Sequence, residues 1–87
     1  MAKGKYSVGR MIPQRWAFGM FDRETKVGVL CIVPNRRQET LFPLIEQYIR
    51  PGSIIHSDEY SVYVNQHTQT SHITNIAVNP PYQHIWV

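Results

Sequence analysis

The order of hydrophobic and polar positions predicts short strands interrupted by one helix. Residues 15–21 alternate at strand spacing, and residues 27–33 form an apolar run that is typical of a central strand covered on both faces. The polar segment 22–26 between them predicts a β-hairpin. Pro34 ends the second strand, because proline cannot donate a hydrogen bond to a sheet.

Residues 36–49 have helical spacing. Their apolar positions recur three and four residues apart and form one face: Leu41, Leu44, Ile45, Tyr48 and Ile49. If Thr40 is the N-cap, Pro43 falls in the first turn, where its missing N–H is not needed. If the helix begins nearer Arg37, Pro43 should loosen the first turn. Either helix would end at Pro51-Gly52.

The second half of the chain predicts smaller elements. Residues 53–57 indicate a buried strand, and residues 59–64 a short helix or helical turn. A polar loop is expected at 65–71 and a further strand at 72–78. The apolar segment 82–87 is left unassigned.

Composition narrows the class of protein. The chain has 87 residues, of which 43% are hydrophobic and 17% charged, which is typical of one small globular domain. No apolar run reaches the ~18 residues that a membrane-spanning helix needs, so no membrane partner is expected. The single cysteine, Cys31, lies in an apolar run, which favours a buried inert thiol over a nucleophile.

Positive charge is concentrated near the start of the chain. Residues 1–13 read as a basic loop or arm, and residues 14–87 as the folded domain. The candidate phosphate-binding residues are Lys3, Lys5, Arg10, Arg15, Arg36 and Arg37. Each of them could equally be a solvated charge.

The acid at the end of the third predicted strand is the candidate catalytic residue. Ligands gather at strand tips in open α/β sheets, which points to Asp58. The alternative is a helix cap or a solvated turn residue. Glu59 is expected to be solvated or to begin a helix, and His56 either supports Asp58 or packs at the strand end.

Other chemistry is disfavoured. Consecutive strand residues point to opposite faces, so His56-Ser57-Asp58 does not predict a catalytic triad. The four histidines lack zinc-finger spacing. The aromatic side chains are expected in the core rather than as platforms for stacking bases.

Three segments resemble, in order, motifs of the DDE transposases of the insertion-sequence family that includes the animal Merlin elements. Gly9-Arg10 with residues 14–19 is similar to that family's "GR…QWVFG". Residues 33–45 are similar to its "VPDR..ETLLPLI", and residues 51–63 to its "PGSTIHSDEWRAY". The resemblance covers Gly9 to Tyr63 and extends more loosely to Val87.

The resemblance implies a metal-dependent enzyme that cleaves and transfers strands of transposon-end DNA. Such enzymes hold two divalent ions, Mg²⁺ or Mn²⁺, with three acidic side chains. Two ions about 3.5–4 Å apart clamp the attacking and leaving oxygens of an in-line displacement. Asp58 falls on the second acidic position, which makes it the expected metal ligand. In the intact enzyme a homo-oligomer is possible, and in a eukaryote the expected compartment is the nucleus.

The first and third acids of the family have no counterpart in these 87 residues. The expected fold is therefore α/β, a partial ribonuclease-H-like mixed sheet with the order β-β-α-β-(short α)-β, lacking the first strand and the C-terminal helices. We expect a transposase fragment that is intracellular, inactive as an isolated chain and poorly soluble. One alternative is a domesticated module that binds nucleic acid or protein without catalysis. Another is an unrelated α/β domain whose acid is structural.

Overall fold

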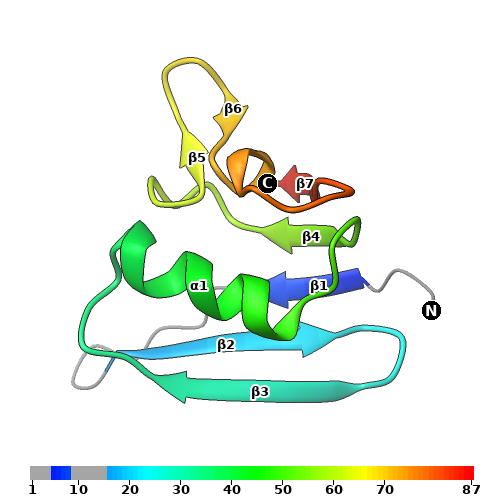
Figure 1. Ribbon diagram of the computed structural model, residues 1–87. Coiled ribbons are helices and arrows are strands. Elements are labelled where there is room, and N and C mark those ends of the chain that lie inside the picture. Colours follow the sequence, from blue (N-terminus) through cyan, green and yellow to red (C-terminus); the bar gives the residue numbers. More distant parts are fainter. Residues whose placement is uncertain (1–4, 9–15) are drawn as a thin grey trace.

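A mixed five-stranded sheet forms the centre of the protein (Figure 1). The computed structural model describes residues 5–8 and 16–87. The strands are β1 (Lys5–Val8), β2 (Ala17–Asp22), β3 (Val27–Ile32), β4 (Ile54–Ser57) and β7 (Gln83–Trp86), in the order β3-β2-β1-β4-β7. β1 runs antiparallel to β2 and parallel to β4, and β4 runs parallel to β7. The predicted α/β class with a mixed sheet is confirmed.

The predicted hairpin is β2 and β3, closed by the polar turn at residues 23–26. Asp22 Oδ1 accepts hydrogen bonds from the backbone N–H groups of Glu24 (2.9 Å) and Thr25 (3.3 Å). Lys26 donates its backbone N–H to the carbonyl of Asp22, with a positive φ of 64°. The expectation that β3 is a covered central strand was wrong. It is an edge strand, and apolar side chains on it are more than half exposed.

The expectation that the sheet has no strand before the hairpin was also wrong. β1 lies within the segment assigned to a basic arm, and it occupies the middle of the sheet. Its Tyr6 pairs with Asp22 of β2 on one side and with Ile55 of β4 on the other. The rest of the expected arm lies outside the described residues. Tyr6 and Val8 are two residues apart and both pack against the core, as strand spacing requires.

The predicted helix is α1 (Gln38–Tyr48), and its apolar stripe packs on the sheet except for Tyr48, which is exposed. Leu41, Ile45 and Ile49 are buried, and Ile49 donates its N–H to the carbonyl of Ile45. Because α1 begins at Gln38, Pro43 lies in the second turn, where a helix normally needs the N–H that proline lacks. Thr40 is inside the helix rather than its cap.

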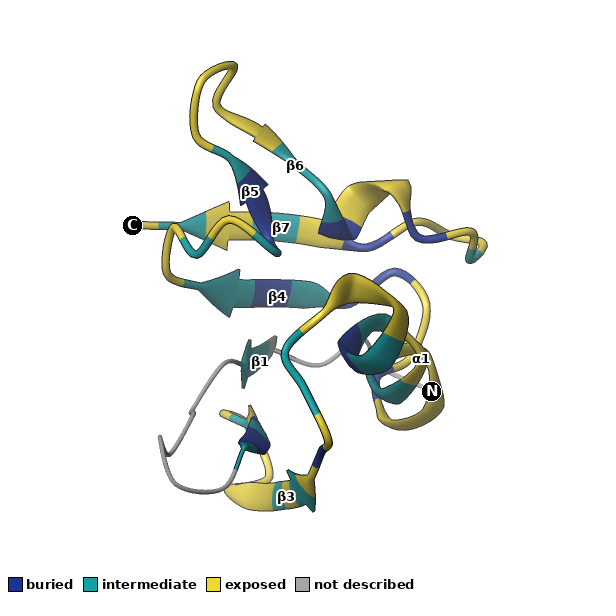
Figure 2. Ribbon diagram, turned by 90° about the vertical axis from the view of Figure 1, so that its left-hand side faces the viewer, coloured by how far each residue is buried: buried dark blue, intermediate teal, exposed yellow. Residues whose placement is uncertain are grey.

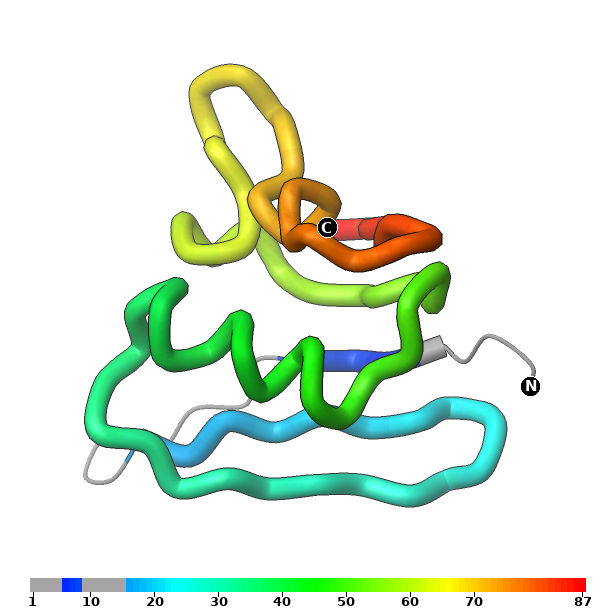
Figure 3. The backbone as a smooth tube through the Cα atoms, viewed as in Figure 1, coloured from blue at the N-terminus to red at the C-terminus, as the bar shows by residue number. Residues whose placement is uncertain are grey.

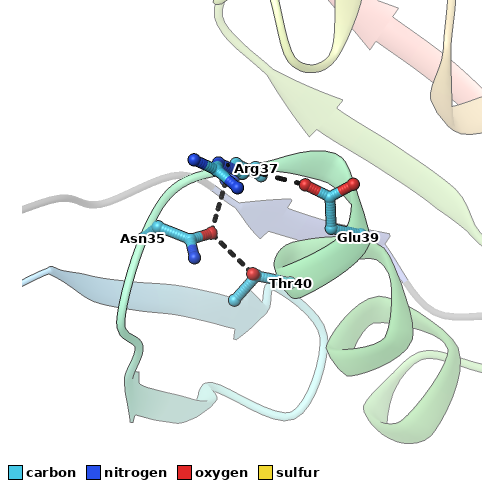
Figure 4. Close-up of polar contacts among 4 residues, drawn as sticks. All are labelled: Asn35, Arg37, Glu39 and Thr40. Carbon is cyan, nitrogen blue, oxygen red and sulfur yellow. Dashed lines mark hydrogen bonds and ion pairs between the residues drawn. The ribbon is translucent and has the colours of Figure 1, made fainter.

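Asn35 organises the start of α1 from outside the helix (Figure 4). Its Oδ1 accepts the backbone N–H of Arg37 at 3.0 Å and the hydroxyl of Thr40 at 2.6 Å. Arg37 is the N-cap residue by its extended backbone, but its side chain makes no capping hydrogen bond. Asn35 therefore fixes the N-cap residue and the Thr40 side chain, and it does not accept the N–H of the second or third helical residue as a capping side chain does.

The core lies between α1 and one face of the sheet. Figure 2 shows α1 on a single side of the sheet, and the buried residues of α1 and of the strands form one cluster. Phe18, Met20 and Ile55 contribute from the strands and are 0–3% exposed. The opposite face carries Phe21, Leu30, Ile32 and Ile85, which are 40–65% exposed; we call these four residues the open face.

The chain after β4 departs from the predicted order. Of the short helix or helical turn predicted at 59–64, a single turn forms at residues 61–63, where Val64 donates its N–H to the carbonyl of Tyr60. A small hairpin follows, β5 (Val64–Asn65) and β6 (Thr70–Ser71). In Figure 3 this hairpin stands out from the sheet. The predicted strand at 72–78 is wrong, because a 3₁₀ turn, η1 (Ile73–Asn75), lies there.

The spacing of two isoleucines explains that error. Ile73 and Ile76 are three residues apart and both buried, which one 3₁₀ turn achieves and a strand does not. The strand that follows β4 in the sheet is β7, in the segment left unassigned.

No helix among residues 5–8 and 16–87 is long and apolar enough to cross a membrane.

Candidate functional site

Asp58 follows the C-terminal end of β4, as the sequence predicted. β4 lies between the parallel strands β1 and β7, so Asp58 leaves the sheet at an inner strand. The residue is exposed, and its Oδ1 accepts the backbone N–H of Tyr60 at 3.1 Å. This contact is an Asx turn, which fixes the direction in which the carboxylate leaves the strand.

Asp58 borders an open hollow of about 850 Å³ on the sheet. Apolar side chains of the hairpin, Phe21 and Leu30 among them, line one part, and Ser7 and His56 line another. His56 thus lies beside Asp58 but points to the open face, because it is paired with Ile85. Its predicted support of Asp58 stays a prediction.

Ser57 points the other way and meets a histidine that the sequence did not single out for Asp58. Its Oγ is 2.6 Å from Nε2 of His84, and it donates to the backbone carbonyl of Asp58 at 2.8 Å. The second ring nitrogen of His84, Nδ1, is 2.6 Å from Oγ of Ser71. Burial lowers the pKa of His84 to about 4, and the charge of His56 adds to the shift. His84 is therefore neutral at pH 7.

Two aromatic rings hold Arg36 close to the edge of the sheet at which β4 ends and Asp58 lies. Its guanidinium carbon lies 4.1 Å from the centre of the Trp16 ring and 5.0 Å from that of Tyr60. Tyr60 and Tyr63 make an edge-on contact at 5.5 Å. Burial raises the pKa of the Tyr63 hydroxyl, the charge of Asp58 adds to this, and Arg36 opposes it. Asp58 and Arg36 thus act on the same buried tyrosine.

The remaining candidate residues are more scattered. Arg37 is 75% exposed and makes one long ion pair, with Glu39 at 4.0 Å. Lys5 belongs to β1, whereas Lys3, Arg10 and Arg15 lie outside the described residues. Glu59 does not begin a helix. Its carboxylate accepts a hydrogen bond from Gln69, and its carbonyl accepts one from Gln66, both in the β5–β6 hairpin.

At this edge the described residues supply Asp58 and the adjacent Glu59, whose carboxylate accepts a hydrogen bond from Gln69. Among residues 5–8 and 16–87, no group of three or more His, Cys, Asp or Glu side chains could hold a metal ion. Asp22 and Glu24 are at the opposite end of the sheet, because β2 runs antiparallel to β1 and β1 parallel to β4. A hard ion such as Mg²⁺ needs several oxygen ligands, so this part of the chain does not fit the ion by itself.

Comparison with known proteins places the chain in a family. No curated protein and no solved structure matches it. The family model of the ISXO2-like transposase domain matches residues 4–83, which include β1, α1 and Asp58. The resemblance drawn from the three motifs is confirmed by this match. The chain therefore belongs to the family of ISXO2-like transposase domains, DDE-type transposases of insertion sequences.

Proposed function

We propose that the chain is part of the catalytic core of a metal-dependent DNA transposase and that Asp58 supplies one of its metal-binding carboxylates. The observation that carries this proposal is the position of Asp58. It follows an inner parallel strand, borders an open hollow and falls within the residues that match the transposase family. Carboxylate oxygen is the ligand that Mg²⁺ and Mn²⁺ prefer.

A ribonuclease-H-like arrangement is part of the same proposal. The strand order β3-β2-β1-β4-β7 supports it, because an antiparallel hairpin leads into a helix and the next strand carries the acid. β1 also supports it, since this strand runs beside β4 and ends at the same edge as Asp58. In the family the strand before the hairpin carries the first acid. Here the residues of β1 are Lys, Tyr, Ser and Val.

We propose further that these 87 residues do not cleave DNA by themselves. All six acidic residues lie at or after Asp22, and only Asp58 and the adjacent Glu59 follow β4. A lone carboxylate is a poor site for a divalent ion that needs near-octahedral oxygen coordination. The ions would supply charge stabilisation of the reacting phosphate when further carboxylates complete the site.

DNA is the partner in this proposal, and the start of α1 is where we place one contact. Stacking covers the flat faces of the Arg36 guanidinium, while its N–H donors lie in the plane and suit a phosphate. Arg37 is more exposed, and its one ion pair among the described residues is long and contributes little to stability. Lys3, Lys5, Arg10 and Arg15 are further candidates.

The test is salt-dependent binding of a short DNA duplex by the purified chain. We expect binding at low salt, and we expect Arg37→Ala to reduce the slope of log K against log salt by about 1. Arg23→Ala is the matched control, because Arg23 is an exposed arginine in the turn at the opposite end of the sheet. No binding at low salt, or equal effects of the two variants, would contradict the DNA contact.

A cleavage assay tests the proposed inactivity, and DNA binding measured with and without Mn²⁺ tests the alternative, a binding module without catalysis. With Mg²⁺ or Mn²⁺ we expect no cleavage by the isolated chain. Cleavage that Asp58→Asn abolishes would refute inactivity and establish the carboxylate as catalytic. The described residues include no group of three side chains that could hold a metal ion, which supports the binding module. That module predicts DNA binding that neither Mn²⁺ nor Asp58→Asn alters.

A further inference from the structure

His84 joins three strands through two serines. Its Nε2 meets Ser57 Oγ at the end of β4, and its Nδ1 meets Ser71 Oγ at the end of β6, both at 2.6 Å. The ring also lies against Trp86, with 5.0 Å between the ring centres. One partly buried imidazole thus connects the central sheet to the small hairpin.

The surrounding hydrogen bonds determine where the ring carries its proton. A serine hydroxyl has one hydrogen, and Ser57 donates it to the backbone carbonyl of Asp58 at 2.8 Å. Nε2 of His84 must therefore be the donor to Ser57. The neutral ring then has no hydrogen on Nδ1, so Ser71 donates its hydroxyl hydrogen to Nδ1 while its Oγ accepts the backbone N–H of Thr74 at 3.1 Å. Only the neutral ring with the proton on Nε2 satisfies every group.

These directions form a continuous relay that ends at Asp58. It runs from Thr74 N–H to Ser71, then to His84, then to Ser57 and finally to the carbonyl of Asp58. Asp58 is also held from its other side, since its Oδ1 accepts the N–H of Tyr60. The backbone and the side chain of this residue are both fixed.

We propose that His84 is a positioning residue, which acts through Ser57 to aim the carboxylate of Asp58 toward the hollow on the sheet. The role of Asp58 in this proposal rests on the function proposed above, whereas the relay itself does not. The same geometry excludes Ser57 as a nucleophile activated by His84. A general base must accept a proton from the nucleophile, but here Nε2 donates and the serine hydrogen is directed to Asp58.

The tautomer of His84 gives the first test, and its main measurement is made on the wild-type chain. Nitrogen chemical shifts at pH 7 should show Nδ1 unprotonated and Nε2 protonated in the full chain, without metal or DNA. Ser71→Ala should alter the Nδ1 signal, because it removes the donor to that nitrogen. His67→Gln is the control, since His67 lies in the exposed turn of the β5–β6 hairpin. A wild-type ring protonated on Nδ1 would overturn the relay.

Amide exchange gives the second test, and it separates positioning from stability. In Ser57→Ala we expect the N–H of Tyr60 to exchange about tenfold faster, because Asp58 loses one of its two restraints. The N–H of Ile49, within the core, should keep its wild-type rate, and Ser57→Thr should restore protection of Tyr60. Unchanged exchange at Tyr60, or equal acceleration at Tyr60 and Ile49, would refute positioning.

Neither measurement depends on DNA or on a divalent ion. A chain that shows the relay but does not bind DNA would therefore contradict only the proposed function. A chain that binds DNA but lacks the relay would contradict only the role of His84.

Discussion

Two fully buried tyrosines differ in what their hydroxyl groups meet. Tyr82 donates to the carbonyl of Ile49 at 2.7 Å, at the end of α1, whereas the hydroxyl of Tyr63 is buried without a partner among the described residues. A buried hydrogen bond contributes about 1 kcal/mol, and a buried group without one costs about 1–3 kcal/mol. The same Tyr→Phe change should therefore act in opposite directions at the two positions.

We expect Tyr82→Phe to lower the free energy of unfolding by about 1–2 kcal/mol. Tyr63→Phe should leave it unchanged or raise it. Urea denaturation of both variants measures this, and Tyr48→Phe is the control because Tyr48 is 43% exposed. A loss of stability in Tyr63→Phe as large as that in Tyr82→Phe would show that the Tyr63 hydroxyl has a partner.

His84 makes stability depend on pH. Its pKa is about 4 in the folded chain against 6.5 for an unperturbed histidine, because burial, aided by His56, disfavours the charged ring. The unfolded chain then binds more protons between these values. Stability that is present above pH 6.5 is lost as pH falls toward 4 and levels off below. Once solvent screening is allowed for, the loss is about 1–2 kcal/mol.

Denaturation at several pH values should show this slope in the wild-type chain and a flatter one in His84→Gln between pH 6.5 and 4. His67→Gln should keep the wild-type slope, which controls for the loss of one histidine. The acidic residues are the same in all three proteins, so the comparison isolates the histidine. An unchanged slope in His84→Gln would assign the pH dependence to other groups.

At the scale of elements, local patterns predicted the parts of the fold that have long apolar repeats. The hairpin, α1 and β4 follow from spacing alone, and so does the strand-end position of Asp58. β1 and β7 each have four residues, as β4 does, but no local pattern marked them as strands, and they are ordered by pairing with β4. The contact between Ser57 and His84 depends on that pairing across 27 residues, so no local pattern could reveal it.

Two residues set the stability of α1 at its start. Asn35 supplies the acceptor for the N–H of Arg37 and the hydroxyl of Thr40, while Pro43 removes a hydrogen bond from the second turn. Asn35→Ala should cost about 1 kcal/mol, the typical net contribution of a hydrogen bond, because it removes the acceptor of both contacts. Pro43→Ala should stabilise the chain, because proline in a helix interior costs about 3 kcal/mol relative to alanine.

Thermal unfolding measures both changes, and Pro34→Ala is the matched proline control because Pro34 is exposed and lies before the helix. A destabilised Pro43→Ala would mean that the rigid ring contributes more than the missing N–H costs.

At the scale of the whole molecule, the sheet is covered unequally. α1 packs on one face, while the open face exposes Phe21, Leu30, Ile32 and Ile85. Exposed apolar surface promotes association, and β3 adds a sheet edge with exposed apolar side chains. The open face and the edge of β3 are thus the expected origin of poor solubility. A missing first strand is not, because β1 is present in the sheet.

The open face should make the chain self-associate as its concentration rises, and one lysine placed there should oppose this. Leu30 is 60% exposed at the centre of β3, so Leu30→Lys should change the free energy of unfolding by no more than about 0.5 kcal/mol. Light scattering over a concentration series should show a larger monomer fraction for this variant than for the wild-type chain. Gln47→Lys on the exposed side of α1 is the control, because it adds the same charge away from the open face. If both lysines suppress association equally, net charge governs solubility; if neither does, the open face does not mediate contact between copies.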